Sequence, residues 1–477
     1  MEYEAVIGLE VHAHLKTRTK AFCGCSTEFG QEPNSQVCPV CLGFPGSLPV
    51  LNRQALEYAI RAGIALNCQV QEFTKFDRKH YYYPDLPKNY QISQYDLPVS
   101  KGGYLDIEVN GKPKRVGITR AHLEEDAGKL MHKDEASLVD LNRAGIPLLE
   151  IVSQPEIASP DEAYAYLTAL KAILEYLEVS DCDMEKGSLR CDANISLRPK
   201  GQNSLGTKAE LKNMNSFKAV RDALAYEIER QENLLQAGEK IIQETRLWDP
   251  KALHTVSMRS KEEAKDYRYF PEPDLPPFLI GRELIEQIKA TIPELPEKKC
   301  RRFIKEYGLT EYDARILVSS KKDAAYAEAV LRAYPAVNKK PMVNWLVGPL
   351  LSEANLKNCR LVELGVPAQD LIELVGFVER QEISQLSAKA VLGEIIKSRQ
   401  KPARIIEEKN LRQVSDSAGL SALIEEAIKE NGKSVNDFKA GKENALMFLV
   451  GQVMRKSNGK ANPKAVQELL RGRLGNA

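Results

Sequence analysis

The sequence has 477 residues, 43% of them hydrophobic and 28% charged, with 67 basic and 66 acidic side chains and a formal net charge of +1. This length exceeds one ordinary hydrophobic core and predicts two or three domains. No run of about eighteen apolar residues occurs, which excludes a membrane-spanning helix, and the acidic start Met1–Glu4 lacks the features of a signal peptide. We therefore expect a cytoplasmic, globular protein.

Strand and helix patterns are mixed up to residue 292. Alternation of apolar and polar residues predicts strands at 6–15, 104–109 and 188–197. A helical spacing of apolar residues predicts helices at 54–67, 159–177 and 216–237. The pair Asn110-Gly111 is typical of a tight hairpin turn. Together these patterns predict an α+β domain with a largely antiparallel sheet over residues 1–292.

A proline-flanked segment, Ile292–Pro296, indicates a domain boundary. Beyond it the pattern is almost wholly helical, with amphipathic helices predicted at 370–381 and 384–398. Residues 400–403 indicate a second boundary. We expect an α+β domain at 1–292, a helical domain at 293–403 and a small helical tail domain at 404–477.

Four of the nine cysteines form two close pairs, Cys23-x-Cys25 and Cys38-x-x-Cys41, separated by a polar, turn-rich loop. Two such pairs can place four thiolates around one tetrahedral Zn²⁺ ion. Two disulfides would suit a secreted protein instead, and a redox pair would need only Cys38 and Cys41. We favour a zinc knuckle over residues 23–41. Because cysteine fills all four positions, the metal is expected to be structural.

Polar side chains gather on one face of the first predicted strand. Alternation places Glu10, His12 and His14 on this face, with Leu9 and Val11 on the other. A carboxylate and an imidazole on one face can share a metal cation. The alternative is an ordinary salt link on a surface strand.

The predicted strand at 188–197 has a second polar face. Its polar row consists of Ser188, Arg190, Asp192, Asn194 and Ser196. Short polar groups beside one arginine suit a concave site better than a solvent-facing strand, which more usually carries lysine, glutamate and threonine.

Two other segments carry charge in informative places. Lys208 and Glu210 share a face of segment 206–212, and Glu150 interrupts the apolar run 146–152. A carboxylate within such a run is costly to bury unless it is paired or binds a metal. Glu150 is therefore a stronger functional candidate than a surface acid.

Several carboxylates, a histidine and nearby cations in one sheet fit Mg²⁺-dependent phosphoryl transfer. In that chemistry oxygen ligands hold the metal while basic side chains neutralise phosphate charge. The sequence has no Gly-x-x-x-x-Gly-Lys-Ser/Thr loop, no kinase-type glycine loop and no Gly-x-Ser-x-Gly element. The common phosphate-binding loops are therefore not in use.

The last segment of the chain is basic. From Asn444 onward a single acid, Glu468, stands against six cations, which are Arg455, Lys456, Lys460, Lys464, Arg471 and Arg473. The segment is either a solvated helix face or a surface that contacts a phosphate backbone, where cations gain by releasing condensed counterions.

Long sequence blocks along the whole chain resemble the B subunits of the glutamyl/aspartyl-tRNA amidotransferases. These blocks are Val6–His12, Lys75–Asp85, Tyr90–Gln94, His122–Lys129, Gly187–Arg198, Asp266–Pro273 and Phe448–Met454. The resemblance implies that residues 1–292 form a cradle-shaped catalytic domain related to glutamine synthetase and guanido kinases. It also implies a helical domain and a tail domain that binds tRNA, for which we name Arg455, Lys456, Lys460 and Lys464.

The resemblance implies a two-step reaction. ATP phosphorylates the side-chain carboxylate of misacylated Glu-tRNA(Gln) or Asp-tRNA(Asn), and ammonia then displaces the phosphate. A separate amidase A subunit makes the ammonia from glutamine, and a small C subunit completes the heterotrimer. Phosphorylation is chemically necessary because a carboxylate otherwise has no good leaving group. The expected cofactors are ATP, Mg²⁺ and a structural Zn²⁺.

The same resemblance implies roles for individual residues. Glu10, His12, Glu125 and Glu150 would hold Mg²⁺. Asp192 and Glu210 would complete an acidic ring, and Lys79 would polarise phosphate or the substrate carboxylate. From strand alternation alone we add Arg190, Asn194 and Lys208 as phosphate or substrate contacts.

Two other functions compete with this interpretation. A non-catalytic, zinc-stapled tRNA-binding protein would explain the basic tail and the cysteines, but not Glu150 or the polar face at 188–196. An autonomous carboxylate–ammonia ligase would need a glutaminase nucleophile, and the sequence shows none.

Overall fold

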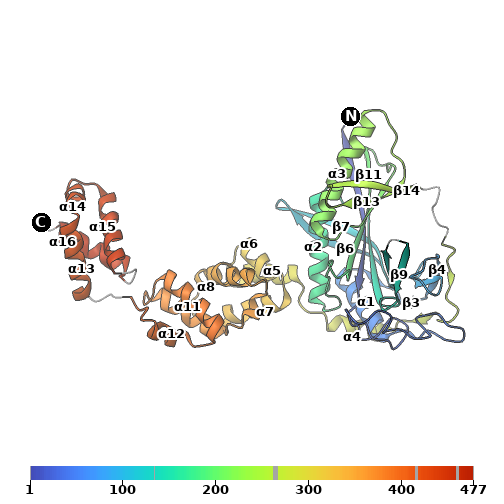
Figure 1. Ribbon diagram of the computed structural model, residues 1–477, viewed down its shortest axis with the longest axis horizontal. Helices are drawn as coiled ribbons and strands as arrows, with labels where there is room; N and C mark the ends of the chain where they lie inside the picture. The colour runs from blue at the N-terminus through green and yellow to red at the C-terminus, as the bar shows by residue number, and fades with distance from the viewer. Residues whose placement is uncertain (1, 134, 261–266, 414–416, 458–460, 476–477) are drawn as a thin grey trace. The chain divides into compact units, whose positions relative to one another are not determined.

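The computed structural model describes residues 2–133, 135–260, 267–413, 417–457 and 461–475 (Figure 1). They form two compact units, Met1–Pro296 and Glu297–Ala477. No helix within the described ranges is long and apolar enough to cross a membrane.

A nine-stranded sheet dominates the first unit, in the order β14-β13-β12-β11-β1-β10-β7-β6-β2. Every neighbouring pair is antiparallel except β12 and β13. The strands are β1 (Tyr3–His14), β2 (Gln69–Val70), β6 (Ser100–Val109), β7 (Lys112–Glu125), β10 (Pro147–Ser153), β11 (Leu189–Pro199), β12 (Ala209–Lys212), β13 (Glu244–Asp249) and β14 (His254–Ser260). The predicted α+β class with a largely antiparallel sheet is confirmed.

Three smaller sheets accompany the large one. The first has three strands, β15 (Phe270–Pro271), β4 (Asp77–His80) and β5 (Tyr90–Ser93). The other two are pairs, β16 (Phe278–Leu279) with β3 (Phe73–Thr74) and β8 (Lys129–Lys133) with β9 (Ala136–Asp140).

The large sheet has one apolar and one polar face. On β1 the apolar row Leu9, Val11 and Ala13 is buried in the main core, together with residues of helices α1 (Arg53–Ala65), α2 (Pro160–Tyr176) and α3 (Phe217–Gln236). Figure 1 shows α2 and α3 lying along the strands of the sheet. The helices cover the apolar face of the sheet. The alternate side chains of each strand point to the opposite face, which is polar.

The sequence places the ends of these elements by local chemistry. Asn52, Ser159 and Ser216 cap α1, α2 and α3 by accepting hydrogen bonds from the backbone N–H groups of the first turn. Asn110 and Gly111 have φ angles of 53° and 73°, which a tight hairpin turn between β6 and β7 requires. These helices and this turn occur where the sequence predicts them.

The second unit is built from helices, which confirms the helical pattern predicted beyond residue 296. They are α5 (Pro296–Tyr307), α6 (Glu311–Leu317), α7 (Lys321–Ala333), α8 (Lys340–Trp345), the π-helix η2 (Leu346–Leu350), α9 (Leu351–Leu356), the 3-10 helix η3 (Leu361–Leu364), α10 (Ala368–Glu379), α11 (Gln385–Ser398), α12 (Pro402–Glu408), α13 (Ser417–Glu430), α14 (Gly432–Lys439), α15 (Glu443–Lys456) and α16 (Pro463–Gly475). Helix α4 (Arg282–Ala290) belongs to the first unit.

A separate apolar cluster holds the last four helices together. It includes Leu420, Ile424, Leu449, Val453 and Leu470. The predicted boundary at 403/404 falls inside α12, and α12 packs against α10 and α11. Ile405 and Ile406 of α12 are buried, and the predicted boundary between the two helical domains stays a prediction.

Candidate active site and metal centre

Strand register brings the polar residues of four distant segments together. His12 on β1 lies opposite Glu150 on β10 and opposite Arg190 on β11. Glu150 in turn lies opposite His122 on β7. Residues directly opposite in neighbouring strands point to the same face, so these side chains form one row across the centre of the sheet.

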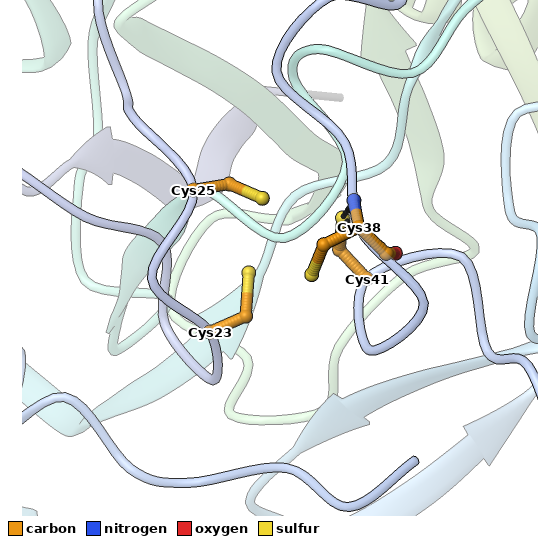
Figure 2. Close-up of side chains that lie close together, drawn as sticks. All are labelled: Cys23, Cys25, Cys38 and Cys41. Carbon is orange, nitrogen blue, oxygen red and sulfur yellow. Dashed lines mark hydrogen bonds between the residues drawn. The ribbon is translucent and has the colours of Figure 1, made fainter. Parts of the chain in front are cut away.

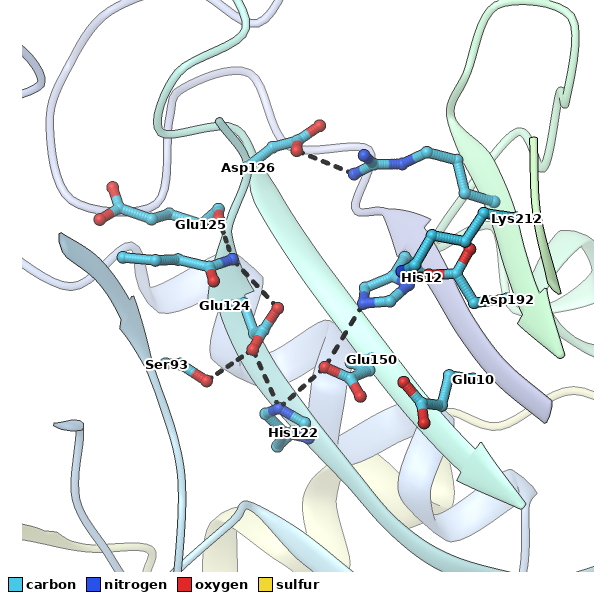
Figure 3. A network of polar contacts seen from close by, with 12 residues as sticks. Glu10, His12, Ser93, His122, Glu124, Glu125, Asp126, Glu150, Asp192 and Lys212 are labelled. Atoms are coloured by element: carbon cyan, nitrogen blue, oxygen red, sulfur yellow. Dashed lines mark hydrogen bonds and ion pairs between the residues drawn. The ribbon is translucent and has the colours of Figure 1, made fainter. Parts of the chain in front are cut away.

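A cluster of two histidines and two glutamates lies at the middle of this row (Figure 3). Glu150 Oε2 is 3.4 Å from His12 Nε2 and 3.3 Å from His122 Nε2. His122 Nε2 is also 3.2 Å from Glu124 Oε1. One ligand atom each from His12, Glu124 and Glu150 lies within 4.8 Å of the others. Imidazole nitrogen and carboxylate oxygen at this spacing can ligate one divalent cation.

Burial makes the charges in this cluster depend on one another. Burial opposes ionisation of Glu150, but His122 and His12 lower its pKa well below the usual value. Burial also opposes the charged form of His122, but the charges of Glu150 and Glu124 raise its pKa to about 9. Two imidazoles thus hold Glu150 ionised. Burial also opposes ionisation of Glu124, but Lys79 and then His122 lower its pKa. A bound divalent cation would supply the same positive charge.

Polar side chains from β5 fix Glu124 in place. Ser93 Oγ donates a 2.6 Å hydrogen bond to Glu124 Oε1, and Gln91 Nε2 donates to Glu124 Oε2 at 3.1 Å. The Glu124 side chain is buried, so its orientation is set by these partners and by His122. A preorganised carboxylate of this kind is suited to holding a metal or a substrate cation.

A second acidic group lies next to the first. Glu10 lies opposite Asp192 across β1 and β11, and Asn194 Nδ2 donates to Glu10 Oε1 at 2.9 Å. Burial, and then the negative charges of Glu150, Asp192 and Glu210, raise the pKa of Glu10. The negative charge around Glu10 is therefore only partly compensated.

Lys212 offsets part of that repulsion. Its Nζ lies 2.6 Å from Asp192 Oδ2 and 3.1 Å from Glu210 Oε1. Thr245 Oγ1 donates to the other oxygen of Glu210 at 2.9 Å. Asp192 and Glu210 are therefore oriented by one ammonium group on the β12 edge of the row.

Lys79, on β4, is half-buried on the side of Glu124. Its Nζ lies 5.1 Å from the ring centroid of Tyr267. Burial opposes its charge, but Glu124, Tyr269 and Glu150 raise its pKa above the usual value. Lys79 is consequently a permanent cation whose charge is felt by the cluster, as charge neutralisation on a phosphate requires.

The four clustered cysteines lie in the loop between β1 and α1 (Figure 2). One sulfur atom from each lies within 4.8 Å of the others, and all four cysteines are free. A tetrahedral Zn²⁺ site with bonds of about 2.3 Å needs sulfur atoms about 3.8 Å apart. The backbone N–H of Cys38 donates to Cys41 Sγ at 3.2 Å. This geometry fits a four-sulfur metal centre.

Comparison with known proteins identifies the family of this chain. A family model described as the GatB/GatE catalytic domain matches residues 5–286, and one described as the GatB domain matches residues 325–474. The chain belongs to the GatB family of amidotransferase B subunits. The family membership predicted from the sequence blocks is thereby confirmed.

Similar proteins of known name cover the whole chain. The B subunit of the aspartyl/glutamyl-tRNA(Asn/Gln) amidotransferase of Carboxydothermus hydrogenoformans is 56% identical over 478 residues, which is 99% of both chains. The protein of the same name from Caldanaerobacter subterraneus subsp. tengcongensis is 56% identical over 475 residues, covering 99% of this chain and 100% of its own. That from Persephonella marina is 52% identical over 470 residues, covering 98% and 99%.

Most predicted site residues of this GatB family member lie on the polar face. The structure brings Glu10, His12, Glu150, Asp192 and Glu210 together there. Asn194 contacts Glu10 as described above. Lys208 is exposed just before β12, and its charge acts on Glu210.

Glu125 is placed differently from Glu124. Its carboxylate accepts a hydrogen bond from the backbone N–H of Ile92 at 2.9 Å and forms an ion pair with Lys88. Glu125 is absent from the group that offers ligand atoms within 4.8 Å. Its predicted role as a magnesium ligand stays a prediction, and it would require the carboxylate to leave Lys88.

Asp126 engages Arg190, a predicted phosphate contact. Asp126 is buried, and its carboxylate lies 2.8 Å from Arg190 Nη2, 2.7 Å from His14 Nε2 and 3.3 Å from Arg143 Nε. Burial opposes ionisation of Asp126, but Arg190, His14 and Arg143 lower its pKa far below the usual range. Arg190 is thus held at the edge of the cluster by a fixed anion.

Sequence reasoning assigned no role to His122 or Glu124, which the structure places in the candidate site. The signal that could have found them is alternation on β7, which places His122 and Glu124 on one face and Leu123 in the core. The register against β10 selects that face, because it sets His122 opposite Glu150.

The predicted tRNA-binding residues lie in the last two helices, with one exception. Arg455 and Lys464 are exposed, and within the described ranges neither makes an ion pair. Lys456 is half-buried and pairs with Glu430 at 2.9 Å and Glu426 at 3.3 Å. Lys460 lies outside the described residues.

Proposed function

We propose that this chain is the ATP-dependent kinase and transamidase component of a tRNA-dependent amidotransferase. It phosphorylates the side-chain carboxylate of Glu-tRNA(Gln) or Asp-tRNA(Asn) and passes the activated group to ammonia. The observation that carries the proposal is the group of half-buried His12 and buried Glu124 and Glu150, whose ligand atoms lie within 4.8 Å of one another on the polar face. Family membership supports the substrate class.

The donor set supports a magnesium site. His12, Glu124 and Glu150 offer one nitrogen and two carboxylate oxygens, and Glu10 stands beside them with a raised pKa. A cation there would relieve the repulsion among the acids. When bound, Mg²⁺ supplies charge neutralisation for the phosphate oxygens of ATP and for the developing phosphoryl charge.

Fixed side chains supply the remaining parts of the chemistry. Lys79 neutralises phosphate or substrate carboxylate charge from the β4 side, while Arg190, held by Asp126, and Lys208 do so from the β11 and β12 side. Asn194 and Lys212 orient Glu10, Asp192 and Glu210 by hydrogen bonds. Groups oriented before the substrate arrives stabilise transition-state charge without reorganisation.

We propose that the sheet and its polar face form a cradle like that of glutamine synthetase and the guanido kinases. The division of labour within the chain follows from this. Residues 1–292 would carry the chemistry, and 293–403 would act as a helical spacer. Residues 404–477 would bind tRNA through Arg455, Lys456, Lys460 and Lys464. The exposure of Arg455 and Lys464 supports their part in phosphate contacts.

We propose further that the four cysteines hold a structural Zn²⁺ ion. All four positions are sulfur, so no coordination site is left for a substrate. The partners would be an amidase A subunit that releases ammonia from glutamine and a small C subunit, with the reaction taking place in the cytoplasm. The relatives are named as one subunit of an amidotransferase, which supports an assembly of several chains.

One assay tests the proposal. The chain is combined with purified A and C subunits, and ATP hydrolysis is measured with and without misacylated tRNA. The wild type is expected to hydrolyse ATP only with misacylated tRNA, and Glu150→Gln should lose at least about 100-fold in rate. Tyr312→Phe, in the second unit, serves as the control. An ATP hydrolysis rate that is the same with and without misacylated tRNA, or that is unchanged in Glu150→Gln, would overturn the proposal.

A further inference from the structure

A lysine is completely buried beside the cysteine cluster. Lys20 is 0% exposed. Its Nζ donates to the backbone carbonyl of Leu141 at 3.3 Å and to Cys41 Sγ at 3.7 Å. Within the described ranges no carboxylate oxygen lies at ion-pair distance from it. A buried ammonium group without a counter-charge is strongly disfavoured. The Glu125 carboxylate lines the same pocket but pairs with Lys88, so the Cys41 sulfur to which Lys20 donates is the group that balances its charge.

The backbone holds Lys20 firmly in this position. Its N–H donates to the carbonyl of Cys25 at 3.0 Å, and the next residue, Ala21, donates to the carbonyl of Gly145 at 2.8 Å. The aliphatic part of Lys20 passes Gly145, where a Cβ atom would lie 3.4 Å from Lys20 Cδ and 3.6 Å from Cys41 Cβ. Gly145 has a φ of +86°, which also favours glycine. The lysine is therefore directed at the sulfur by the fold.

The charge of a four-thiolate metal centre explains why a lysine belongs there. One Zn²⁺ ion and four thiolates carry a net charge of −2. Cys41 is the most buried of the four cysteines, so water screens its charge least. An ammonium group that donates a hydrogen bond to this sulfur offsets one unit of the negative charge, as outer-shell partners of metal ligands commonly do.

We propose that Lys20 is the built-in counter-cation of the four-cysteine metal centre and that its charge sets how tightly the metal is held. This rests on the proposed zinc site. Lys20 does not coordinate the metal itself. It is a positioning residue that donates to the metal-bound sulfur of Cys41 and reduces the net charge of the centre from −2 to −1.

The test is zinc retention by the full-length chain. Zinc-loaded wild type, Lys20→Met and Lys20→Gln are challenged with a chromogenic chelator, and zinc affinity and release rate are measured. Lys20→Met keeps the aliphatic length without the charge, and Lys20→Gln keeps a hydrogen-bond donor without the charge. Lys16→Met makes the same change at an exposed position of the same loop and serves as the control. Absorption of the Co²⁺-substituted proteins and far-ultraviolet circular dichroism verify the sulfur geometry and the fold.

We expect Lys20→Met and Lys20→Gln to bind zinc about 10–100-fold more weakly, with Lys16→Met equal to wild type. If wild type retained no zinc, the proposed zinc site itself would fail. If wild type held zinc and both Lys20 variants held it equally well, the zinc site would stand and the counter-cation would be refuted. Full retention by Lys20→Gln alone would also refute it, because a neutral donor would then suffice.

Discussion

Glu124 and Glu125 are adjacent on β7, yet their carboxylates have different partners. Glu124 Oε1 lies 3.2 Å from His122 Nε2, whereas Glu125 accepts from the backbone N–H of Ile92 and pairs with Lys88. Alternation along the end of the strand separates the two functions. Glu124 belongs to the proposed cation site, and Glu125 lies against the loop that carries the cysteines.

This separation predicts different defects in two variants. Glu124→Gln should weaken Mn²⁺ binding, used as a spectroscopic stand-in for Mg²⁺, by about 10–100-fold because a ligand oxygen is replaced. Glu125→Gln should leave Mn²⁺ affinity close to wild type. Electron paramagnetic resonance of free Mn²⁺ measures both. The reverse order of effects would show that Glu125 leaves Lys88 to bind the cation, as first predicted from the sequence.

Removing the charge of Asp126 is expected to lower the stability of the protein, because this buried carboxylate is the counter-ion of two arginines. Asp126→Asn would leave the cations Arg190 and Arg143 without their buried counter-ion. Because both guanidinium groups are partly exposed to water, we expect a cost of about 2–3 kcal/mol, below that of a fully buried pair. Asp106→Asn breaks an exposed ion pair with Arg115 and should change stability much less. Urea unfolding of the full-length variants, followed by circular dichroism, compares them. Similar unfolding midpoints for both variants would contradict the assigned role of Asp126.

Glu328, on α7 in the helical unit, is expected to stabilise the folded protein in a pH-dependent way. Burial opposes its ionisation, but Arg302 and Lys299 lower its pKa from 4.5 to about 2. A carboxylate with a lowered folded-state pKa stabilises the protein above pH 4.5, and this contribution is lost as the pH falls towards 2. Glu328→Gln should cost about 2 kcal/mol at pH 7.

The denaturant midpoints of wild type and Glu328→Gln, measured from pH 7 to pH 3, check this expectation. The two curves should converge as the pH falls. A constant difference across the range would show that the variant acts through packing and not through charge.

Arg455 and Lys464, which make no ion pair within the part of the chain that the structure describes, lead to a prediction about the salt dependence of tRNA binding. Arg455→Ala and Lys464→Ala together should weaken binding and reduce the slope of log affinity against log salt by about 2, one unit for each phosphate contact. Arg471 and Arg473 pair with Glu443 and Glu425, so the same changes there form the control. Filter binding across salt concentrations gives the slope. Equal slopes for both double variants would exclude specific contacts by Arg455 and Lys464.

Local sequence signals predicted the elements well but not the partners of individual side chains. Apolar spacing locates α1, α2 and α3, and alternation identifies the polar faces of β1 and β11. The choice between Glu124 and Glu125 depends on the register of β7 against β10. That register is a long-range property, because Glu150 and His122 are far apart in the chain. No local pattern marks Lys20 either, since only the folded loop brings it to Cys41.

The position of β1 also has a consequence for the timing of assembly. It is the first strand to be synthesised, yet it lies between β10 and β11, which end at Ser153 and Pro199. At typical synthesis rates the ribosome needs roughly 10–40 s to produce the chain as far as β11. Both edges of β1 lack a native partner until β10 is complete, and the edge that pairs with β11 stays free until Pro199 has been added. A strand with a free edge is prone to pair with other chains. Glu10 and His12 are therefore synthesised well before Glu150 and Asp192, the residues on β10 and β11 with which they form the site.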